Sequence, residues 1–328
     1  MKVLISDYKD SMMPEHNYEI EVLKAGLPNV DVEVYEYTDA NRLSFIEKIG
    51  SVDALLTAFI PIDKAILDNA PVLKVISLNA TGYDNVDLTE ATKHSIGVCP
   101  VGEYCTQDVA EHTIALMLSL NKNLKYYAYS IERSFKWAFD AAPAPVRIGN
   151  QTLGIFGLGR IGRAVASKAQ CLGMKVIAHD PFVNAAEAQA LGVELTDLKD
   201  LLRRSDVISN HMNLGEETTH YFTDAEFKAM ARRPIFLNLG RGLSVDEAAL
   251  VEALDTGQVR AAGLDVLTNE RPVLEGHPLT NRPNVIITPH SAFYSEESFI
   301  DIQRISCQNI VNYLTNKKDK VFKLVNDV

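Results

Sequence analysis

Three charged or titratable side chains follow segments of the chain that read as buried strands. Arg241 lies between two glycines, Glu270 follows an apolar run that ends at Leu264, and His290 follows one that ends at Thr288. Each of them alone is explained more simply as a surface residue in a turn. If the strands belong to one parallel sheet, however, their carboxyl ends meet at one edge. Arginine can then bind a carboxylate at two points, histidine can donate a proton and glutamate can hold that histidine, which are the groups that reduction of a 2-oxo acid needs.

The segment from Thr152 to Asp180 contains the most specific motif. Its glycines Gly157, Gly159 and Gly162 have the spacing G-x-G-x-x-G between an apolar strand and a helix. In this context the first glycine allows a tight turn, the second lets a pyrophosphate approach the backbone, and the third lets helix and strand pack closely. Free N–H groups and the positive end of the helix dipole then face the pyrophosphate. The pattern predicts a dinucleotide site, with three packing glycines as the alternative.

The acidic residue at the end of this segment indicates which dinucleotide is bound. Asp180 follows the strand predicted at Lys175–His179, where a carboxylate can accept hydrogen bonds from a ribose diol. The same charge would repel a 2′-phosphate, and Pro181 and Phe182 add no cation. We therefore expect the cofactor to be NAD rather than NADP. The alternative is a surface aspartate without a ligand.

Composition limits the function classes. The chain has 328 residues, 47% of them hydrophobic, and a net charge of −11, which disfavours nucleic acid and anionic membranes as partners. No apolar run approaches the roughly 20 residues of a membrane span, and the first ten residues lack the apolar core of a signal peptide. The four cysteines have neither metal-ligand nor redox spacing. We expect a cytoplasmic protein with reduced thiols and no metal.

The first hundred residues alternate short apolar runs with amphipathic stretches, as in a parallel sheet with crossover helices. The predicted strands are Val3–Ser6, Val32–Tyr35, Ala54–Thr57, Val75–Leu78 and Gly97–Cys99, and the predicted helices are Glu15–Ala25, Asn41–Ile49, Asp63–Asn69 and Leu88–His94. The fourth strand leads into Asn79–Asn85, a loop of small residues whose N–H groups could hold a carboxylate. As a bare motif this loop is more simply an ordinary turn.

The remaining elements complete a second domain. Thr106–Leu124 is apolar around most of its circumference, so we expect a buried helix that crosses between domains and also packs on a second subunit. Phe135–Arg147 reads as an irregular connection. Further strands are predicted at Asp206–Asn210, Pro234–Asn238, Val259–Leu264 and Asn284–Thr288, and the helix at Glu296–Asn316 is expected to return to the first domain. The fold class is α/β: two doubly wound parallel-sheet domains, with a Rossmann NAD-binding domain (102–293) inserted into a flavodoxin-like substrate domain (1–101 and 294–328).

Together these motifs resemble the D-isomer-specific 2-hydroxyacid dehydrogenase family over nearly the whole chain. The resemblance is carried by Ala80–Asp87, the glycine motif, Asn238–Gly242, Leu264-Asp265-Val266 followed by Glu270, and Thr288-Pro289-His290. Within the family, Glu103-Tyr104-Cys105, Val109–His112 and His290–Ser295 are similar to the branch that contains the C-terminal-binding-protein corepressors.

The resemblance implies an NAD-dependent oxidoreductase that interconverts a 2-oxo acid and a D-2-hydroxy acid. It implies that Arg241 is the substrate clamp, His290 the acid and base, and Glu270 its partner. It also places Thr81 and Gly82, together with Arg241 and His290, at the substrate. The implied cofactor contacts are Gly157, Gly159, Arg160, Ile161, Gly162, Asp180, Met212, Thr218, Leu239, Gly240, Arg241 and Asp265. A homodimer is a further implication, whereas His112, His211 and His220 are expected to be structural or peripheral.

Two rival functions and the substrate class stay open. Phe293 stands where the corepressors have tryptophan, but an NAD(H)-sensing binding protein is a rival to the enzyme, as is a dehydrogenase of a phosphorylated acid such as phosphoglycerate. The loops Tyr8–Met13, Ala58–Pro61 and Asn79–Tyr83 contain Lys9 as their one basic residue. This favours uncharged aliphatic or aromatic 2-oxo acids, with Phe293 and Trp137 as further aromatic walls. In the alternative, Phe59 and Ile60 pack under their loop and leave a small polar pocket for glyoxylate or hydroxypyruvate.

Overall fold

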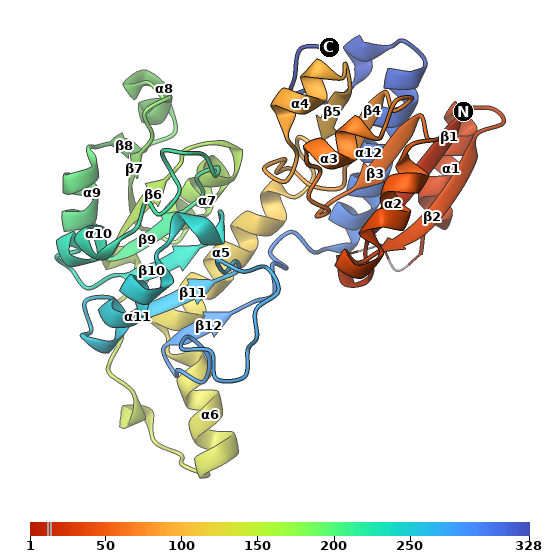
Figure 1. Cartoon of the computed structure of the whole chain (residues 1–328). Coiled ribbons are helices and arrows are strands. Elements are labelled where there is room, and N and C mark those ends of the chain that lie inside the picture. Colours follow the sequence, from red (N-terminus) through yellow and green to blue (C-terminus); the bar gives the residue numbers. More distant parts are fainter. Residues whose placement is uncertain (12, 14) are drawn as a thin grey trace. The chain divides into compact units, whose positions relative to one another are not determined.

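The computed structural model describes residues 1–11, 13 and 15–328, and it divides into two compact units (Figure 1). Unit 1 comprises Met1–Tyr104 and Ser295–Val328, and unit 2 comprises Cys105–Tyr294. The units meet at 104/105 and 294/295, and the sequence analysis placed the domain boundaries at 101/102 and 293/294. Each unit contains one parallel sheet, as the sequence predicts.

Unit 1 is built on five parallel strands in the order β2-β1-β3-β4-β5, which is the flavodoxin-like order that the sequence predicts. The strands are β1 (Lys2–Tyr8), β2 (Asp31–Tyr37), β3 (Ala54–Thr57), β4 (Val75–Leu78) and β5 (Gly97–Pro100). The helices are α1 (Asn17–Gly26), α2 (Arg42–Ile49), α3 (Lys64–Asp68), α4 (Leu88–Lys93) and, from the far end of the chain, α12 (Glu296–Leu314). As expected, α12 returns to this unit, where it contacts α1 and β4.

Both faces of the sheet in unit 1 are covered, which explains why β3, β4 and β5 are buried along their whole length. One face packs against side chains of α2, α3 and α4, including Phe45, Ile49 and Ile66. The opposite face packs against α1 and α12, through residues such as Leu23 and Ile310. The C-terminal helix is therefore part of the core on which the loops of unit 1 are mounted.

Unit 2 is built on seven parallel strands in the order β12-β11-β10-β9-β6-β7-β8, which is a Rossmann order with one added strand. The strands are β6 (Thr152–Phe156), β7 (Lys175–His179), β8 (Glu194–Leu195), β9 (Val207–Asn210), β10 (Ile235–Asn238), β11 (Ala261–Leu264) and β12 (Val285–Ile287). The helices are α5 (Thr106–Asn121), α6 (Leu124–Ser134), α7 (Arg160–Cys171), α8 (Ala185–Ala190), α9 (Leu198–Arg204), α10 (Asp224–Ala229) and α11 (Glu247–Asp255).

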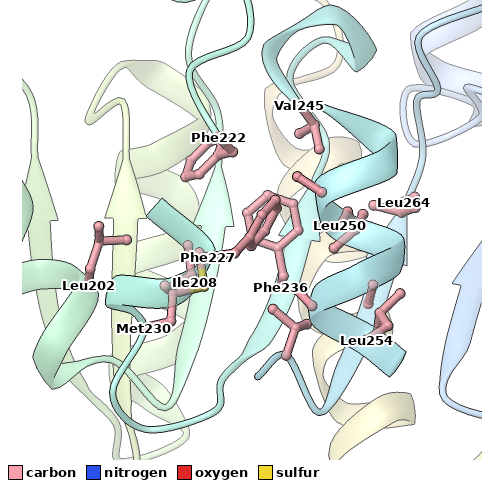
Figure 2. Packing of buried hydrophobic residues seen from close by; sticks show 14 of the residues in the cluster. Leu202, Ile208, Phe222, Phe227, Met230, Phe236, Val245, Leu250, Leu254 and Leu264 are labelled. Atoms are coloured by element: carbon pink, nitrogen blue, oxygen red, sulfur yellow. The ribbon is translucent and has the colours of Figure 1, made fainter. Parts of the chain in front are cut away.

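An aromatic cluster holds one face of this second sheet (Figure 2). Phe222 lies edge-on to Phe156 with ring centroids 4.9 Å apart, and edge-on to Phe236 at 5.0 Å. Phe227 of α10 completes the group at 5.3 Å from Phe236. Such edge-to-face pairs fix ring orientations as well as burying area. They therefore hold β6, β10 and the loops next to these strands in fixed positions relative to one another.

The helix predicted at Thr106–Leu124 ends early. α5 stops at Asn121, Asn123 has a φ of 55°, and a second helix, α6, then runs to Ser134, which the sequence analysis did not predict. The buried side of α5 packs on α7, β10 and β11 of its own unit. In this part of the chain, large exposed apolar side chains lie instead on α6 and in the irregular segment after it. Trp137, in that segment, is 91% exposed, so the expectation that it walls a pocket is wrong within this chain.

None of the helices formed by the described residues has the length and apolarity required to cross a bilayer. No disulfide joins the four cysteines, all of which the structure describes: Cys99, Cys105 and Cys307 are buried, and Cys171 is exposed.

Candidate active site

The glycine turn between β6 and α7 leaves backbone open to a ligand. Gly157 has a φ of 84°, and its N–H donates to the carbonyl of His179 at 3.1 Å. A Cβ at Gly162 would lie 2.2 Å from the carbonyl oxygen of Gly157, so only glycine lets α7 pack this closely. A Cβ at Gly159 would meet nothing within 4 Å, and both Gly159 and Arg160 are exposed. The start of α7 thus offers room and N–H groups to a pyrophosphate, with Ile161 half-buried behind it.

Asp180, directly after β7, is held beside this turn. Its Oδ2 accepts a hydrogen bond from the N–H of Leu158 at 2.7 Å, and its Oδ1 accepts one from the N–H of Phe182 at 2.8 Å. These contacts orient the carboxylate from both sides of the strand end. Each carboxylate oxygen has a second lone pair, so the geometry fits acceptance of hydrogen bonds from a ribose diol.

Two buried asparagines join the loops after β9 and β10. Asn210 Nδ2 donates to Asn238 Oδ1 at 3.0 Å, and Asn238 Nδ2 donates to the carbonyl of Arg241 at 3.0 Å. The same Asn238 Oδ1 accepts from the N–H of Gly240 at 3.2 Å, while Asn210 Oδ1 accepts from the N–H of Met212 at 3.1 Å. The sequence analysis missed both asparagines. The sequence feature that could have indicated them is an asparagine as the last residue of each of two strands, and these strands prove to be neighbours in the sheet.

Arg241 therefore projects from a loop whose backbone is fixed. Its guanidinium Nη1 donates to the carbonyl of Gly240 at 3.0 Å, and Leu239 beside it is 8% exposed. A Cβ at Gly242 would lie 1.9 Å from the carbonyl oxygen of Leu267, so the loops after β10 and β11 are in direct backbone contact. Gly242 thus permits this close approach, whereas a Cβ at Gly240 would lie 2.9 Å from the carbonyl oxygen of Met212, after β9.

His290 and Glu270 form the pair predicted from the sequence. His290 Nδ1 lies 2.8 Å from Glu270 Oε2, with 30% and 40% of the two side chains exposed. The histidine has a φ of 50°, a left-handed conformation that is uncommon outside glycine, asparagine, aspartate and histidine. Its N–H donates to the carbonyls of Asp265 and Thr288, at 2.8 and 3.0 Å. The turn is therefore defined by several backbone contacts, and it presents the imidazole toward solvent.

Asp265 has a structural task that the sequence analysis did not predict. The residue is 2% exposed, and its Oδ1 accepts from Thr288 Oγ1 at 2.6 Å and from the N–H of Ser291 at 2.9 Å. Its Oδ2 accepts from the N–H of Ala292 at 3.0 Å. The carboxylate thus fastens the turn that carries His290. The role beside the nicotinamide that the resemblance implies stays a prediction.

The other histidines of unit 2 differ in their surroundings. His112 of α5 places Nε2 3.0 Å from Thr288 Oγ1, next to the turn of His290 rather than at the periphery. His211 follows β9, with Nε2 2.8 Å from Ser209 Oγ; burial lowers the pKa of this imidazole to about 4. The N–H of His220 donates to the carbonyl of Leu243 at 2.8 Å. Thr218, predicted at the cofactor, donates to the carbonyl of Asn213 at 2.7 Å and so closes its own loop.

The substrate residues predicted in unit 1 follow β4. Thr81 is exposed and Gly82 half-buried. Of the three loops used to predict the side-chain class, one contains Met12, which lies outside the described residues. Ile60 is fully buried in the core, so it packs under its loop, whereas Phe59 is 39% exposed. Lys323, which the sequence analysis did not consider when it counted basic residues near the substrate, lies over the ring of Tyr83. Its Nζ is 5.2 Å from the ring centroid.

In unit 2 the chemistry converges on one edge. Strands β6, β7, β9, β10, β11 and β12 are parallel neighbours, so the loops that follow them share the carboxyl edge of the sheet. That edge carries the glycine turn, Asp180, Arg241, Asp265 with Glu270, and His290. Such an edge can hold a dinucleotide across its middle and place an arginine and a carboxylate-paired imidazole at its end.

Comparison with known proteins agrees with this geometry. Residues 114–292 match the family model of the D-isomer specific 2-hydroxyacid dehydrogenase, NAD binding domain. A glyoxylate reductase of Aeropyrum pernix is 35% identical over 294 residues, covering 88% of this chain and 88% of that protein. A D-3-phosphoglycerate dehydrogenase of Archaeoglobus fulgidus is 33% identical over 313 residues, covering 95% of this chain and 57% of that protein.

Solved structures agree as well. The crystal structure of D-lactate dehydrogenase from Aquifex aeolicus, complexed with NAD and lactic acid, matches with a TM-score of 0.87 and 26% identity and covers 99% of both chains. The similarity to the corepressor branch stays a prediction. The matched family model spans more than half of the chain, and relatives above 30% identity are covered over most of its length. The chain therefore belongs to the D-isomer specific 2-hydroxyacid dehydrogenase family of NAD-dependent oxidoreductases.

Proposed function

We propose that this protein catalyses the reversible, NAD(H)-dependent reduction of a 2-oxo acid to a D-2-hydroxy acid. The observation that carries the proposal is the contact between His290 Nδ1 and Glu270 Oε2 at 2.8 Å, at the same sheet edge as Arg241. A carboxylate on one ring nitrogen fixes the orientation of the imidazole. Because Nδ1 faces Glu270, the proton for the substrate would come from Nε2.

The residues act in a definite order. Arg241 binds the substrate carboxylate and polarises the adjacent carbonyl, because its guanidinium matches a carboxylate in two-point geometry. Thr81 and Gly82 are proposed as substrate-binding residues because the resemblance implies it, through their backbone N–H groups. NADH, when bound, supplies the hydride that adds to C2. His290 then transfers the Nε2 proton to the oxygen of the forming alkoxide, and Glu270 keeps the ring in place during the transfer. In the oxidative direction, His290 takes that proton back.

NADH is proposed as the preferred dinucleotide. The carboxylate of Asp180 occupies the end of β7, and the side chain that follows next but one, Phe182, is 91% exposed and uncharged. A 2′-phosphate there would meet a negative charge and no compensating cation in the segment Asp180–Phe182. We therefore expect kcat/KM with NADH to exceed that with NADPH by at least about 10²-fold, since one uncompensated charge contact costs several kcal/mol.

An uncharged aliphatic or aromatic 2-oxo acid is the proposed substrate class. The exposed Phe59 supports this choice, whereas the burial of Ile60 and the presence of Lys323 near Tyr83 favour a smaller or more polar substrate. Relatives described as glyoxylate reductase and as D-3-phosphoglycerate dehydrogenase represent the two alternatives. The choice therefore depends on direct measurement.

A substrate panel tests the whole proposal. NADH oxidation is followed with phenylpyruvate, a branched 2-oxo acid, glyoxylate, hydroxypyruvate and phosphohydroxypyruvate, and each is repeated with NADPH. Turnover of at least one unphosphorylated 2-oxo acid with NADH is expected, and chiral analysis of the product should give the D-isomer. Higher kcat/KM for glyoxylate or phosphohydroxypyruvate would overturn the side-chain class alone. Binding of NADH without turnover of any acid would favour the sensor-like alternative.

A homodimer is proposed, with α6 rather than α5 as its principal surface. On α6, Leu124, Tyr129 and Ile131 are 55%, 63% and 45% exposed, and the segment after it exposes Phe135 and Trp137 by 89% and 91%. Contiguous apolar surface of this kind marks interfaces.

Because Trp137 is the one tryptophan of the chain, its fluorescence reports on this surface. Association should shift its emission to shorter wavelength and protect it from acrylamide. A monomer in sedimentation at micromolar concentration would contradict the proposal. The cytoplasmic location expected from the sequence stays a prediction.

A further inference from the structure

His112 contacts the turn that presents His290, although it lies on α5, far away in the sequence. Its Nε2 is 3.0 Å from Thr288 Oγ1 and 3.9 Å from Asp265 Oδ1. Thr288 Oγ1 in turn lies 2.6 Å from Asp265 Oδ1. The three side chains thus form a chain of polar contacts from the helix to the buried carboxylate.

The direction of each hydrogen bond in this chain follows from the number of protons. A threonine hydroxyl has one proton, and the contact at 2.6 Å directs it to the carboxylate of Asp265, which can only accept when ionised. Thr288 Oγ1 must then accept at its other contact, so His112 donates from Nε2. Both the neutral Nε2–H tautomer and the imidazolium can do this. The contact therefore persists whether or not His112 is protonated.

The turn at His290 needs such support. A non-glycine residue with a φ of 50° carries backbone strain, and strained residues persist where their surroundings over-determine them. Asp265 supplies most of the constraint through Thr288 Oγ1 and the N–H groups of Ser291 and Ala292. His112 restrains the one side chain in this set that could otherwise rotate, the hydroxyl of Thr288.

We propose that His112 is a positioning residue for the reaction: its hydrogen bond to Thr288 fixes the turn that presents His290 to the substrate. The inference rests on the proposed function, in which His290 transfers the proton. His112 itself transfers no proton to the substrate. Its effect is on the fraction of time that the His290 ring spends in the geometry needed for transfer, because small misplacements of a catalytic group are costly.

A double-mutant cycle tests this inference with four proteins: wild type, His112→Leu, Thr288→Val and the double variant. His112→Leu removes the donor of this hydrogen bond and should lower kcat roughly 3- to 10-fold, the worth of one neutral hydrogen bond. Thr288→Val removes its acceptor and also the donor to Asp265, so the loss of kcat should be at least as large. KM for NADH should stay within about twofold. The double variant should be no slower than Thr288→Val alone, because the acceptor is already absent. Multiplying effects would overturn the inference, as would an unchanged kcat in His112→Leu.

Two substitutions at the same position separate positioning from packing. The amide nitrogen of glutamine reaches as far as Nε2 of histidine, so His112→Gln should restore most of the lost kcat. Asparagine is polar but too short, so His112→Asn should behave like His112→Leu. Equal turnover in the glutamine and asparagine variants would contradict the proposal. Glu111→Gln is the matched control and should leave kcat unchanged: Glu111 lies beside His112 on α5 and forms an exposed ion pair with Lys168 of α7.

A measurement without turnover keeps this test separate from that of the proposed function. In nitrogen-correlated NMR spectra, the imidazole signals of His290 should broaden or shift in His112→Leu and in Thr288→Val, but not in Glu111→Gln. If the wild type reduces no 2-oxo acid, the proposed function fails while these spectra still decide the role of His112. Identical His290 signals in all four proteins would refute the positioning role.

Discussion

Unit 1 and unit 2 each bury an aspartate at the end of a strand, and each aspartate fastens the loop of a neighbouring strand. In unit 1, Asp7 near the end of β1 is 4% exposed. Its Oδ2 accepts from Thr57 Oγ1 at 3.4 Å and from the N–H groups of Ala58 and Phe59, at 2.5 and 3.0 Å. Burial raises the pKa of this carboxyl group, against the lowering effect of the N–H donors.

Asp265 in unit 2 repeats the arrangement with the same kinds of partners. It also accepts from a threonine hydroxyl, that of Thr288, and from two consecutive N–H groups, those of Ser291 and Ala292. In both units the aspartate and its tethered loop belong to adjacent parallel strands, β1 with β3 and β11 with β12. A buried aspartate with these partners is therefore a way to fasten loops at the carboxyl edge of a parallel sheet.

What differs is the residue that each fastened loop presents. The loop in unit 1 presents Phe59, an apolar side chain, whereas the turn in unit 2 presents His290, which contacts Glu270. In addition, His112 braces the threonine in unit 2. A buried strand-end aspartate is thus no evidence of catalysis by itself. The chemistry depends on the side chain that the loop carries. The comparison can therefore be tested by substitutions in either unit.

Replacement of the side chain that each fastened loop presents should give the largest difference in kcat between the two units. His290→Ala should lose about 10² to 10⁴ in kcat, the usual contribution of a positioned acid, and should bind NADH as tightly as the wild type. Phe59→Ala, at the corresponding place in unit 1, exchanges no proton and should leave kcat within about threefold. Steady-state kinetics with the best 2-oxo acid, together with NADH titration by fluorescence, measure both. Near-normal turnover of His290→Ala would mean that another group supplies the proton.

Replacement of the fastening aspartates should give a smaller and more selective effect. Asp7→Asn and Asp265→Asn each turn one acceptor oxygen into a donor that faces N–H groups, so each should lower the free energy of unfolding by about 1–3 kcal/mol. Only Asp265→Asn should also lower kcat, roughly tenfold or more, because its loop presents His290. Urea unfolding and kinetics are measured on both variants. An equal loss of kcat in Asp7→Asn would break the distinction between the two loops.

The sequence did not predict all strands and helices of the two units equally well. The strands and the two sheet orders follow from short apolar runs that alternate with amphipathic stretches, because a parallel sheet buried on both faces needs such runs. The two-residue strand β8 lacks this signal. α6 was not predicted, and its apolar side chains prove to be exposed. The end of α5 was misplaced because Asn123 adopts left-handed backbone within an otherwise helical pattern.

For the candidate site, the sequence analysis named the side chains proposed for the chemistry, whose roles stay a prediction, and missed the residues that hold their loops. His290 and Glu270 could be paired in advance, because their types and strand-end positions suggest one function. Asn210 and Asn238 could not, because a buried asparagine is identified by its partners, and those depend on which strands are neighbours. His112 was expected to be structural or peripheral, and its contact with Thr288 could not be predicted for the same reason: it spans α5 and the end of β12.

The two units should also respond differently to mild acid. His211, with a pKa of about 4 in the folded chain, stays neutral while the unfolded chain takes up a proton near pH 6.5, so the free energy of unfolding falls as pH drops from 6.5 toward 4. From pH 7 to pH 5 this amounts to about 2 kcal/mol. The raised pKa of Asp7 has the reverse sign: its proton is held more tightly in the folded chain, and stability is lost as pH rises through that pKa.

Amide hydrogen exchange at pH 5 and pH 7, corrected for intrinsic rates, resolves the two units. Protection in unit 2 should decrease at pH 5, whereas protection in unit 1 should hold or increase. In His211→Gln, which keeps a polar atom near Ser209, the decrease in unit 2 should disappear. An equal acid response in both units, or an unchanged response in this variant, would show that His211 does not control it.

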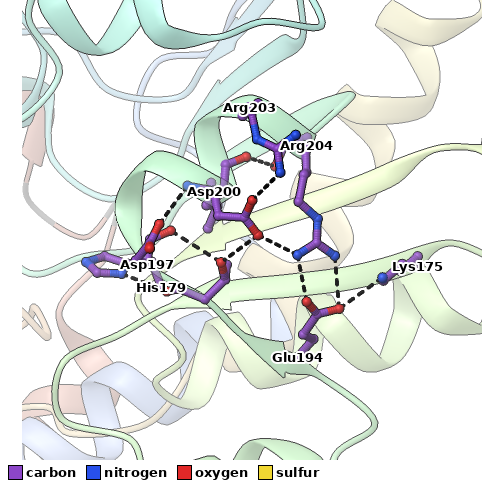
Figure 3. Close-up of polar contacts among 10 residues, drawn as sticks. Lys175, His179, Glu194, Asp197, Asp200, Arg203 and Arg204 are labelled. Carbon is purple, nitrogen blue, oxygen red and sulfur yellow. Dashed lines mark hydrogen bonds and ion pairs between the residues drawn. The ribbon is translucent and has the colours of Figure 1, made fainter.

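The smallest effects are expected at the surface, where the two units should not differ. In unit 2, Arg204 contacts Glu194 at 2.6 Å and Asp200 at 2.6 Å, and Lys175 adds a contact with Glu194 at 2.9 Å (Figure 3). In unit 1, Glu33 contacts Lys2 at 2.8 Å.

Hydrogen bonds from Arg204 and Lys175 lower the pKa of Glu194 to about 2, and those from Lys2 and Lys48 lower that of Glu33. The stabilisation is thus present above the unfolded pKa near 4.5 and is lost as pH falls toward 2. With 43% of the Glu194 side chain exposed, solvent screens most of it. Arg204→Met and Glu33→Gln should each lower Tm by roughly 1–3 °C in low salt, and by less in 1 M NaCl. kcat should be unchanged in both. A larger, salt-independent loss confined to Arg204→Met would show that the network in unit 2 acts as a buried one, and that the units differ at their surfaces as well as at their loops.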